Sequence, residues 1–118
     1  MLKINFKSKT KIVATEAGKQ IGYLNFNYER DASKKRNIFI SYMYVKSEYR
    51  RKGIGSKMLK FLLAKKKNIT WINFWTGKEI EKNKGTNIYI KNGFQKLAYQ
   101  EDYYEKGVGT TLFVKRIK

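Results

Sequence analysis

The sequence predicts an α+β domain with a mixed, mostly antiparallel sheet of about six to seven strands and two main helices. Segments rich in β-branched and aromatic residues recur along the chain, separated by polar or glycine-containing stretches. A long helical pattern follows one of these segments, because apolar residues at 54, 58, 59, 62 and 63 share one face of a helix ending near residue 67. The length of 118 residues fits one domain, residues 1–118.

The first part of the chain is typical of antiparallel strands. Four strands are expected, at residues 2–6, 11–16, 20–28 and 38–45. A tight turn at 17–19 makes the second and third strands a hairpin. The charged segment 29–37 is expected to face solvent as a loop before the fourth strand.

The second part alternates strands with a shorter helix. Strands are expected at 69–76, 94–99 and 110–116, and the second main helix at 86–92, although residues 88–90 are better strand formers. The strand at 69–76 follows the long helix after a short link, as parallel neighbours do. Residues 77–85 and the acidic stretch 100–109 are expected to be irregular. The closing strand could pair with its counterpart in a homodimer.

Composition limits the function classes. With neither cysteine nor histidine, the chain has no disulfide or thiol nucleophile, and the common transition-metal sites are not expected. No apolar run approaches the ~20 residues that span a bilayer, and residues 1–6 lack the apolar block of a signal peptide, so a cytoplasmic protein is expected. The net charge of +18 favours nucleic acid, phosphorylated cofactors or acidic partners, or reflects a lysine-rich nucleotide bias.

The turn between the fourth strand and the long helix has the features of an anion site. Arg50, Arg51 and Lys52 are followed by two glycines, Gly53 and Gly55, just where the helix begins. The first N–H groups of a helix and its dipole favour anions, and glycine lets a ligand approach the backbone. Residues 50–56 are therefore predicted to bind an anionic group such as a pyrophosphate.

Four segments together resemble one protein family. They are Gln20-Ile21-Gly22-Tyr23, the stretch Val45 to Gly55 with its Arg-x-x-Gly-x-Gly pattern, the amphipathic helix after it, and Tyr89-Ile90-Lys91-Asn92-Gly93-Phe94. In this order they resemble the GNAT family of N-acetyltransferases over about residues 11–118. The resemblance implies an acyl-CoA N-acyltransferase-like fold, acetyl-coenzyme A as cosubstrate and an amine as acceptor.

The resemblance also implies roles for particular residues. The backbone around Met43 and Val45 would bind the pantetheine arm, and Asn83, one residue from the family's usual asparagine position, carries a weaker role. Tyr89 matches a general acid for the departing thiolate, with its pKa expected to be lowered by nearby cations; it could also only pack its ring or order the sulfur. The pyrophosphate would be held by Arg50, Arg51, Lys52, Gly53, Ile54, Gly55 and Ser56.

The sequence does not single out one residue as the general base. The strand at 38–45, where some family members carry a glutamate, has no carboxylate. Glu79 and Glu81 could reach the acceptor amine directly or through water, or could be solvated loop charges. A positive field that favours the neutral amine is a further alternative.

The start of the chain departs most from the family. Members usually place one or two helices between the first two strands, whereas residues 7–10 alone fill that interval here. This short version is expected to have an open acceptor side, which suits a macromolecular amine on a protein or on charged tRNA. The alternative function is a catalytically weak module of the same fold that binds nucleic acid or an acidic partner.

Overall fold

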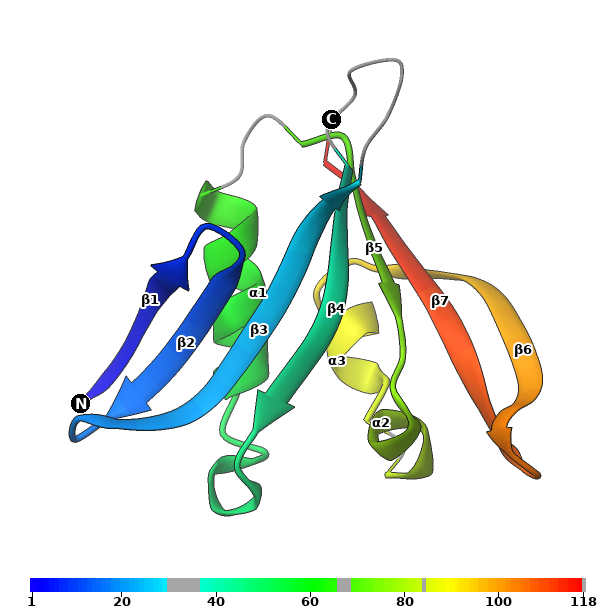
Figure 1. Cartoon of the computed structure of the whole chain (residues 1–118), viewed down its shortest axis with the longest axis horizontal. Helices are drawn as coiled ribbons and strands as arrows, with labels where there is room; N and C mark the ends of the chain where they lie inside the picture. The colour runs from blue at the N-terminus through cyan, green and yellow to red at the C-terminus, as the bar shows by residue number, and fades with distance from the viewer. Residues whose placement is uncertain (30–36, 66–68, 84, 118) are drawn as a thin grey trace.

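The computed structural model describes residues 1–29, 37–65, 69–83 and 85–117, and in these ranges one sheet of seven strands is present, in the order β1-β2-β3-β4-β5-β7-β6 (Figure 1). Only β4 and β5 pair in parallel; the other pairs are antiparallel. The predicted mixed, mostly antiparallel sheet is therefore confirmed. The strands are β1 (Leu2–Ser8), β2 (Lys11–Glu16), β3 (Lys19–Glu29), β4 (Asn37–Val45), β5 (Trp71–Trp75), β6 (Gln95–Glu105) and β7 (Val108–Arg116).

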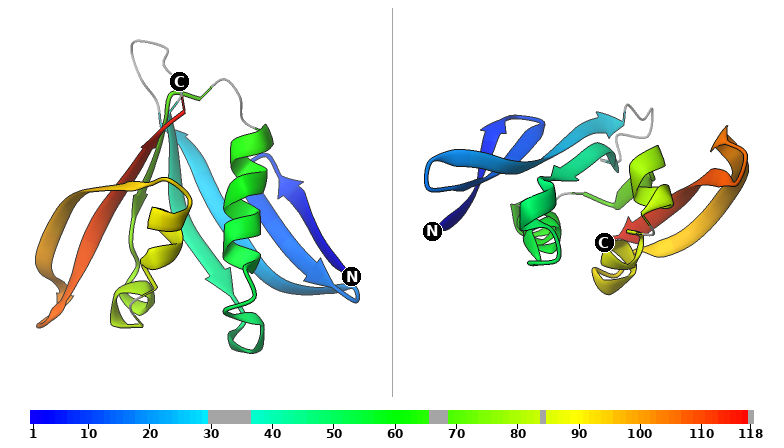
Figure 2. Two further views of the ribbon diagram at one scale, coloured as in Figure 1. Left: turned by 180° about the vertical axis from the view of Figure 1, so that it is seen from behind. Right: turned by 90° about the horizontal axis from the view of Figure 1, so that it is seen from below.

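The helices leave one face of the sheet uncovered. They are α1 (Ile54–Lys65), α2 (Lys78–Lys82) and α3 (Asn87–Lys91), with a short 3-10 turn at Ser47–Tyr49. Figure 2 shows α1 and α3 on the same side of the sheet. The core lies between them and the sheet, where Met58 and Leu62 of α1 are fully buried with Ile40 and Phe74. Burial of such a side chain stabilises the fold by about 1.5–3 kcal/mol.

The long helix forms where its apolar spacing predicts. Its buried residues recur at intervals of one, three and four and face the strands. Gly53 precedes it with φ 77°, and its carbonyl accepts the first helical hydrogen bond from the N–H of Lys57 at 3.0 Å. The last residue of α1 described is Lys65, so the predicted end near residue 67 lies outside the described residues. Most of the predicted loop at 29–37 does too.

A third helix, α2, forms in the segment that was expected to be irregular. Its residues Lys78–Lys82 are good helix formers, and its two acidic residues lie in the first turn, where the helix dipole favours them. Gly77 enters in an extended conformation, and the helix ends at Asn83, whose N–H binds the carbonyl of Glu79 at 2.9 Å. A short helix thus links β5 to α3.

The prediction of an irregular acidic loop at 100–109 is wrong, because β6 and β7 form one long hairpin there. The turn lies at Gly107, which has φ 82°. Its N–H donates to the carboxylate of Asp102 at 2.6 Å, and Asp102 itself has φ 54° within an irregularity of the pairing. The acidic residues therefore shape a bulged strand instead of a loop.

The predicted dimer contact through the closing strand is also wrong. β7 lies inside the sheet and pairs with β5 on one side and β6 on the other. Its backbone groups are therefore used within the chain, and the edges of the sheet are β1 and β6.

Candidate active site

The two parallel strands separate halfway along their length. Pairing of β4 with β5 ends at Ile40 and Phe74, although β4 continues to Val45. Figure 1 shows the two strands diverging beyond this point. On its other side β4 pairs with β3 to its end, with a bulge at Ser41 between the paired residues Ile40 and Tyr42. The backbone of residues 41–45 therefore has no strand partner on the β5 side.

Two residues expected at the cofactor lie on this free stretch. Met43 and Val45 pair with Leu24 and Gly22 of β3. Gly22 is required here, because a Cβ on it would lie 2.8 Å from the carbonyl oxygen of Tyr44. The close approach of β3 holds the end of β4 in place.

The cations of the turn differ in what they contact. The Nε of Arg50 donates to the carbonyl of Val45 at 2.8 Å, and its guanidinium lies 5.6 Å from the Tyr44 ring centroid. The Lys52 ammonium lies 5.5 Å from the ring of Tyr49. Arg51 has φ 64° and is exposed. Arg50 therefore closes the turn back onto β4.

The first turn of α1 presents free backbone donors. Because Gly53 is the N-cap, the N–H groups of Ile54, Gly55 and Ser56 have no partner within the helix. No carboxylate lies in this first turn. The donors and the positive end of the helix dipole together form a site suited to a phosphate group.

The glycine turn and the stretch Tyr89 to Phe94 come together in space. A Cβ on Gly55 would lie 2.6 Å from the Cδ1 atom of Ile88, so glycine allows α3 to pack against the start of α1. The Nδ2 of Asn92 donates to the hydroxyl of Ser56 at 3.0 Å and to the carbonyl of Ile88 at 2.8 Å. Asn92 thereby fixes the helix start against α3.

Tyr89 lies entirely inside the core. Its side chain is 0% exposed, and its ring packs on Phe74, Phe94 and Phe113 with centroids 4.6, 5.9 and 5.3 Å away. Burial raises the pKa of the Tyr89 phenol, so the expectation that cations lower it is wrong. Its hydroxyl has no hydrogen-bond partner. A buried hydroxyl without a partner costs about 1–3 kcal/mol.

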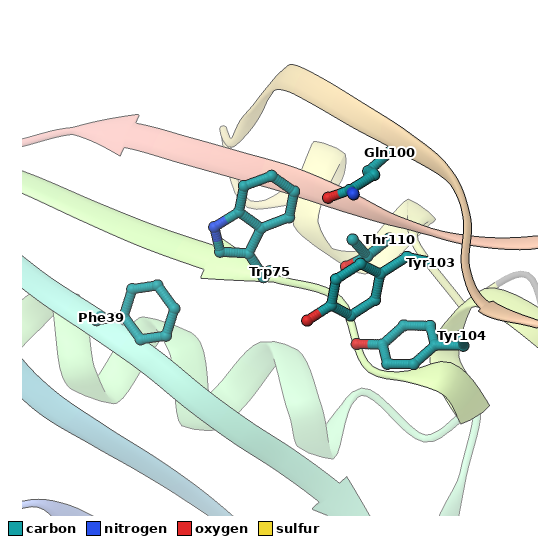
Figure 3. A pocket seen from close by; sticks show the side chains of 6 residues that line it. All are labelled: Phe39, Trp75, Gln100, Tyr103, Tyr104 and Thr110. Atoms are coloured by element: carbon teal, nitrogen blue, oxygen red, sulfur yellow. The ribbon is translucent and has the colours of Figure 1, made fainter.

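The uncovered face of the sheet has a cavity of about 330 Å³ beside the end of β5. Figure 3 shows the side chains around it, which come from four different strands. Phe39 and Trp75 alternate with the buried Ile40 and Phe74, and so they face away from α1 and α3. The sequence analysis missed this cavity. Its lining residues are Phe39, Trp75, Gln100, Tyr103, Tyr104 and Thr110.

A chain of hydroxyl groups connects this cavity to Glu81 of α2. The Thr76 hydroxyl donates to Oε2 of Glu81 at 2.6 Å. The hydroxyl of Thr110, a residue that lines the cavity, donates to the carbonyl of Thr76 at 2.8 Å and lies 3.5 Å from the Thr76 hydroxyl. The Thr111 hydroxyl donates to the same carboxylate oxygen at 2.9 Å. Tyr104 donates to the carbonyl of Thr76 at 2.6 Å. The Glu81 carboxylate is therefore held by two hydrogen bonds from threonine hydroxyls, so it is not a solvated loop charge.

The other two candidates of this region lie apart from the chain of hydroxyl groups. Glu79 is exposed on α2, and Asn83 follows the C-terminal end of the same helix. Asn83 thus lies at the end of the helix that carries Glu81.

Comparison with known proteins gives one family. The family model of the acetyltransferase (GNAT) domain matches residues 7–96. No curated protein sequence matches the chain. Within the described ranges, no helix has the length and apolar character needed to cross a membrane.

Three solved structures illustrate the fold. A chain of the NatC complex bound to Gag peptide and CoA is 18% identical, with a TM-score of 0.78, covering 92% of this chain and 71% of that one. Arabidopsis thaliana Naa50 with a bisubstrate analogue is 21% identical (TM-score 0.72, 89% and 71% covered). IAA acetyltransferase from Bacillus cereus is 22% identical (TM-score 0.72, 90% and 76% covered). At these identities the likeness is one of fold.

Proposed function

The chain belongs to the GNAT acetyltransferase family, and from this premise we propose that it transfers the acetyl group of acetyl-coenzyme A to a primary amine on a macromolecule. The observation that carries the proposal is the free edge of β4 at residues 41–45, which ends beside the uncapped start of α1. The amides of the pantetheine arm could pair with the free backbone groups of β4, and the pyrophosphate could bind the first N–H groups of α1.

The residues present fit the cosubstrate. The free N–H and C=O groups around Met43 and Val45 would pair with the amides of the pantetheine arm, as an added strand does. The N–H groups of Ile54, Gly55 and Ser56 would hold the pyrophosphate, and Arg51 and Lys52 would add charge. Part of the Val45 carbonyl's capacity is already used by Arg50.

We assign Tyr89 the role of hydrogen-bond donor to the leaving sulfur. Its hydroxyl is buried and without a partner, and the sulfur of the thioester would supply one. Proton transfer from an ordinary phenol to a thiolate of pKa about 8.5 is uphill by roughly 2 kcal/mol, and the raised pKa of Tyr89 makes it more so. Tyr89 would therefore stabilise the thiolate by a hydrogen bond, and solvent would supply the proton.

The acceptor amine would enter from the uncovered face. The cavity beside Trp75 lies across the sheet from α1 and α3, so donor and acceptor would meet where β4 and β5 separate. Hairpin residues 9 and 10 alone join β1 to β2, so no helix stands between these strands to enclose the amine. An acceptor site left open in this way suits an amine carried by a larger molecule.

Glu81 would be the base for this amine. The nitrogen attacks the acetyl carbonyl carbon, the C–S bond breaks, and the nitrogen must lose one proton. The Glu81 carboxylate would take that proton directly or through water, held in place by the hydroxyls of Thr76 and Thr111, which donate to its Oε2 at 2.6 and 2.9 Å. Glu81 then releases this proton to solvent and the thiolate takes one up from solvent, so the products of a neutral amine are an amide and the free thiol of coenzyme A.

The direct test is calorimetric titration with acetyl-coenzyme A, followed by a screen of peptide N-termini, lysine peptides and aminoacyl-tRNA for release of free thiol. Saturable binding together with thiol release by one of these amines is expected. Binding without thiol release for any amine would favour the alternative of a catalytically weak module, and absence of saturable binding would contradict the proposal.

A further inference from the structure

The uncovered face of β3 and β4 has three tyrosine rings in contact, which we call the tyrosine cluster: Tyr23, Tyr42 and Tyr44. The Tyr23 ring lies 5.9 Å from that of Tyr42 and 5.7 Å from that of Tyr44. Tyr42 and Tyr44 are 39% and 36% exposed. They flank Met43, which packs against the core on the other side of the sheet. The rings therefore form a surface layer that the helices do not cover.

Two cations of the described residues lie against this cluster. The Lys11 ammonium lies 4.7 Å from the centroid of the Tyr23 ring, and the Arg50 guanidinium lies 5.6 Å from that of Tyr44. The whole chain has a net charge of +18. Exposed rings interleaved with cations offer stacking partners for bases and charge partners for phosphates.

We propose that the tyrosine cluster binds single-stranded nucleic acid, with bases against Tyr42 and Tyr44 and phosphates near Lys11 and Arg50. Side chains on a flat sheet can stack only on bases that are not already stacked in a duplex, which selects single strands. The proposal concerns binding alone and holds whether or not acetyl transfer occurs.

The position of Tyr42 brings this surface to the acceptor cavity. A Cβ on Gly77 would lie 3.9 Å from Cε1 of Tyr42, so the ring contacts the segment that follows β5. Trp75 and Phe39, which line the cavity, continue the aromatic surface across β4 and β5. A bound strand therefore passes beside the place where the amine would enter.

The test uses fluorescence anisotropy with a fluorescein-labelled U12 oligoribonucleotide. Stacking on an aromatic side chain contributes about 1–3 kcal/mol per base, so the Tyr42→Ala/Tyr44→Ala variant, which loses two stacking partners, should bind U12 at least about thirtyfold more weakly. Tyr99→Ala is the matched control, because Tyr99 is 48% exposed and has Lys96 5.1 Å from its ring, but lies on β6. It should change the affinity less than about twofold. If the double variant loses its folded circular dichroism spectrum, the single Tyr42→Ala variant replaces it. The single variant should still lose more affinity for U12 than Tyr99→Ala does.

A second measurement follows the salt dependence. Each phosphate contact with a single strand contributes about −0.7 to the slope of log K against log salt concentration. Lys11→Ala should reduce the slope by about this amount, and Lys96→Ala should not. Equal behaviour of the cluster and control variants would mean diffuse charge attraction and overturn the proposal. It would also be overturned if the wild type sediments as a dimer that Tyr42→Ala dissociates without loss of U12 affinity.

Discussion

The two faces of the sheet are built in different ways. On the helix face, the proposed donor site consists of backbone groups: the free edge of β4 and the first N–H groups of α1. On the uncovered face, the acceptor cavity consists of side chains, chiefly Trp75, Tyr103 and Tyr104. The proposed amine site is thus lined by side chains, whereas the proposed cosubstrate site is made of main-chain groups.

This difference predicts which changes are tolerated. A backbone site depends on glycines and turns, so few substitutions preserve it, whereas a cavity lined by aromatic side chains can change its shape one residue at a time. The same scaffold can therefore keep one donor while its acceptor varies. Each experiment below acts on one face and uses the other as a reference.

The largest effect is expected from a change in the phosphate turn. Gly53→Glu places a carboxylate at the start of α1 and a side chain at φ 77°. Hydrogen bonds to a charged group contribute about 1.5–3 kcal/mol each, so loss of two should weaken acetyl-coenzyme A binding about 1,000-fold by calorimetry. Gly18→Glu is the control, because Gly18 also has φ 77° and open space around its Cβ position. An equal loss of binding in the control would show that charge or strain elsewhere causes the effect.

Glu81→Gln should lower kcat/KM for the amine about 100-fold, the lower range for loss of a general base. The amide is nearly the same shape as the carboxylate but cannot take the proton of the amine. Glu79→Gln, an exposed position on the same helix, should have little effect.

Thr76→Ser should keep activity because it keeps the hydroxyl, and Thr76→Val should not. If Thr76→Val is as active as Thr76→Ser, the hydrogen bond from Thr76 does not position the Glu81 carboxylate for the reaction.

The parts that the sequence could predict are local in the chain. The conformations of the turn at 50–56 and of the stretch from Tyr89 to Phe94 are set by nearby residues, because glycines, helix starts and apolar spacing act within a few positions of the chain. The cavity could not be predicted, since Trp75 and Thr110 become neighbours only when β7 pairs with β5. The bonded state of Glu81 depends on the same pairing, and α2 formed where polar composition suggested a loop.

Tyr89→Phe removes only the Tyr89 hydroxyl and should affect catalysis and stability in opposite directions. Loss of a hydrogen bond to the leaving sulfur should reduce kcat about tenfold. The protein without cosubstrate should become about 1 kcal/mol more stable in urea, because the buried hydroxyl has no partner. Above pH about 10 an unfolded tyrosine ionises while the buried one, with its raised pKa, stays neutral. Wild-type stability should therefore fall there, and the variant should lack that part of the fall. A lower stability of the variant at neutral pH would mean that the hydroxyl has a partner inside the protein.

The smallest effect is expected in the acceptor cavity. Trp75 is 36% exposed, so its replacement by alanine removes only part of a ring's contact area. Trp75→Ala should raise the KM of the amine about fivefold, which corresponds to about 1 kcal/mol of apolar contact, and leave acetyl-coenzyme A affinity unchanged. Trp71 is the matched control, because it lies four residues earlier on the same face of β5, where the Arg116 guanidinium lies 5.8 Å from the centroid of its ring. If Trp71→Ala raises KM equally, the amine is bound along the whole face and the cavity is not its site.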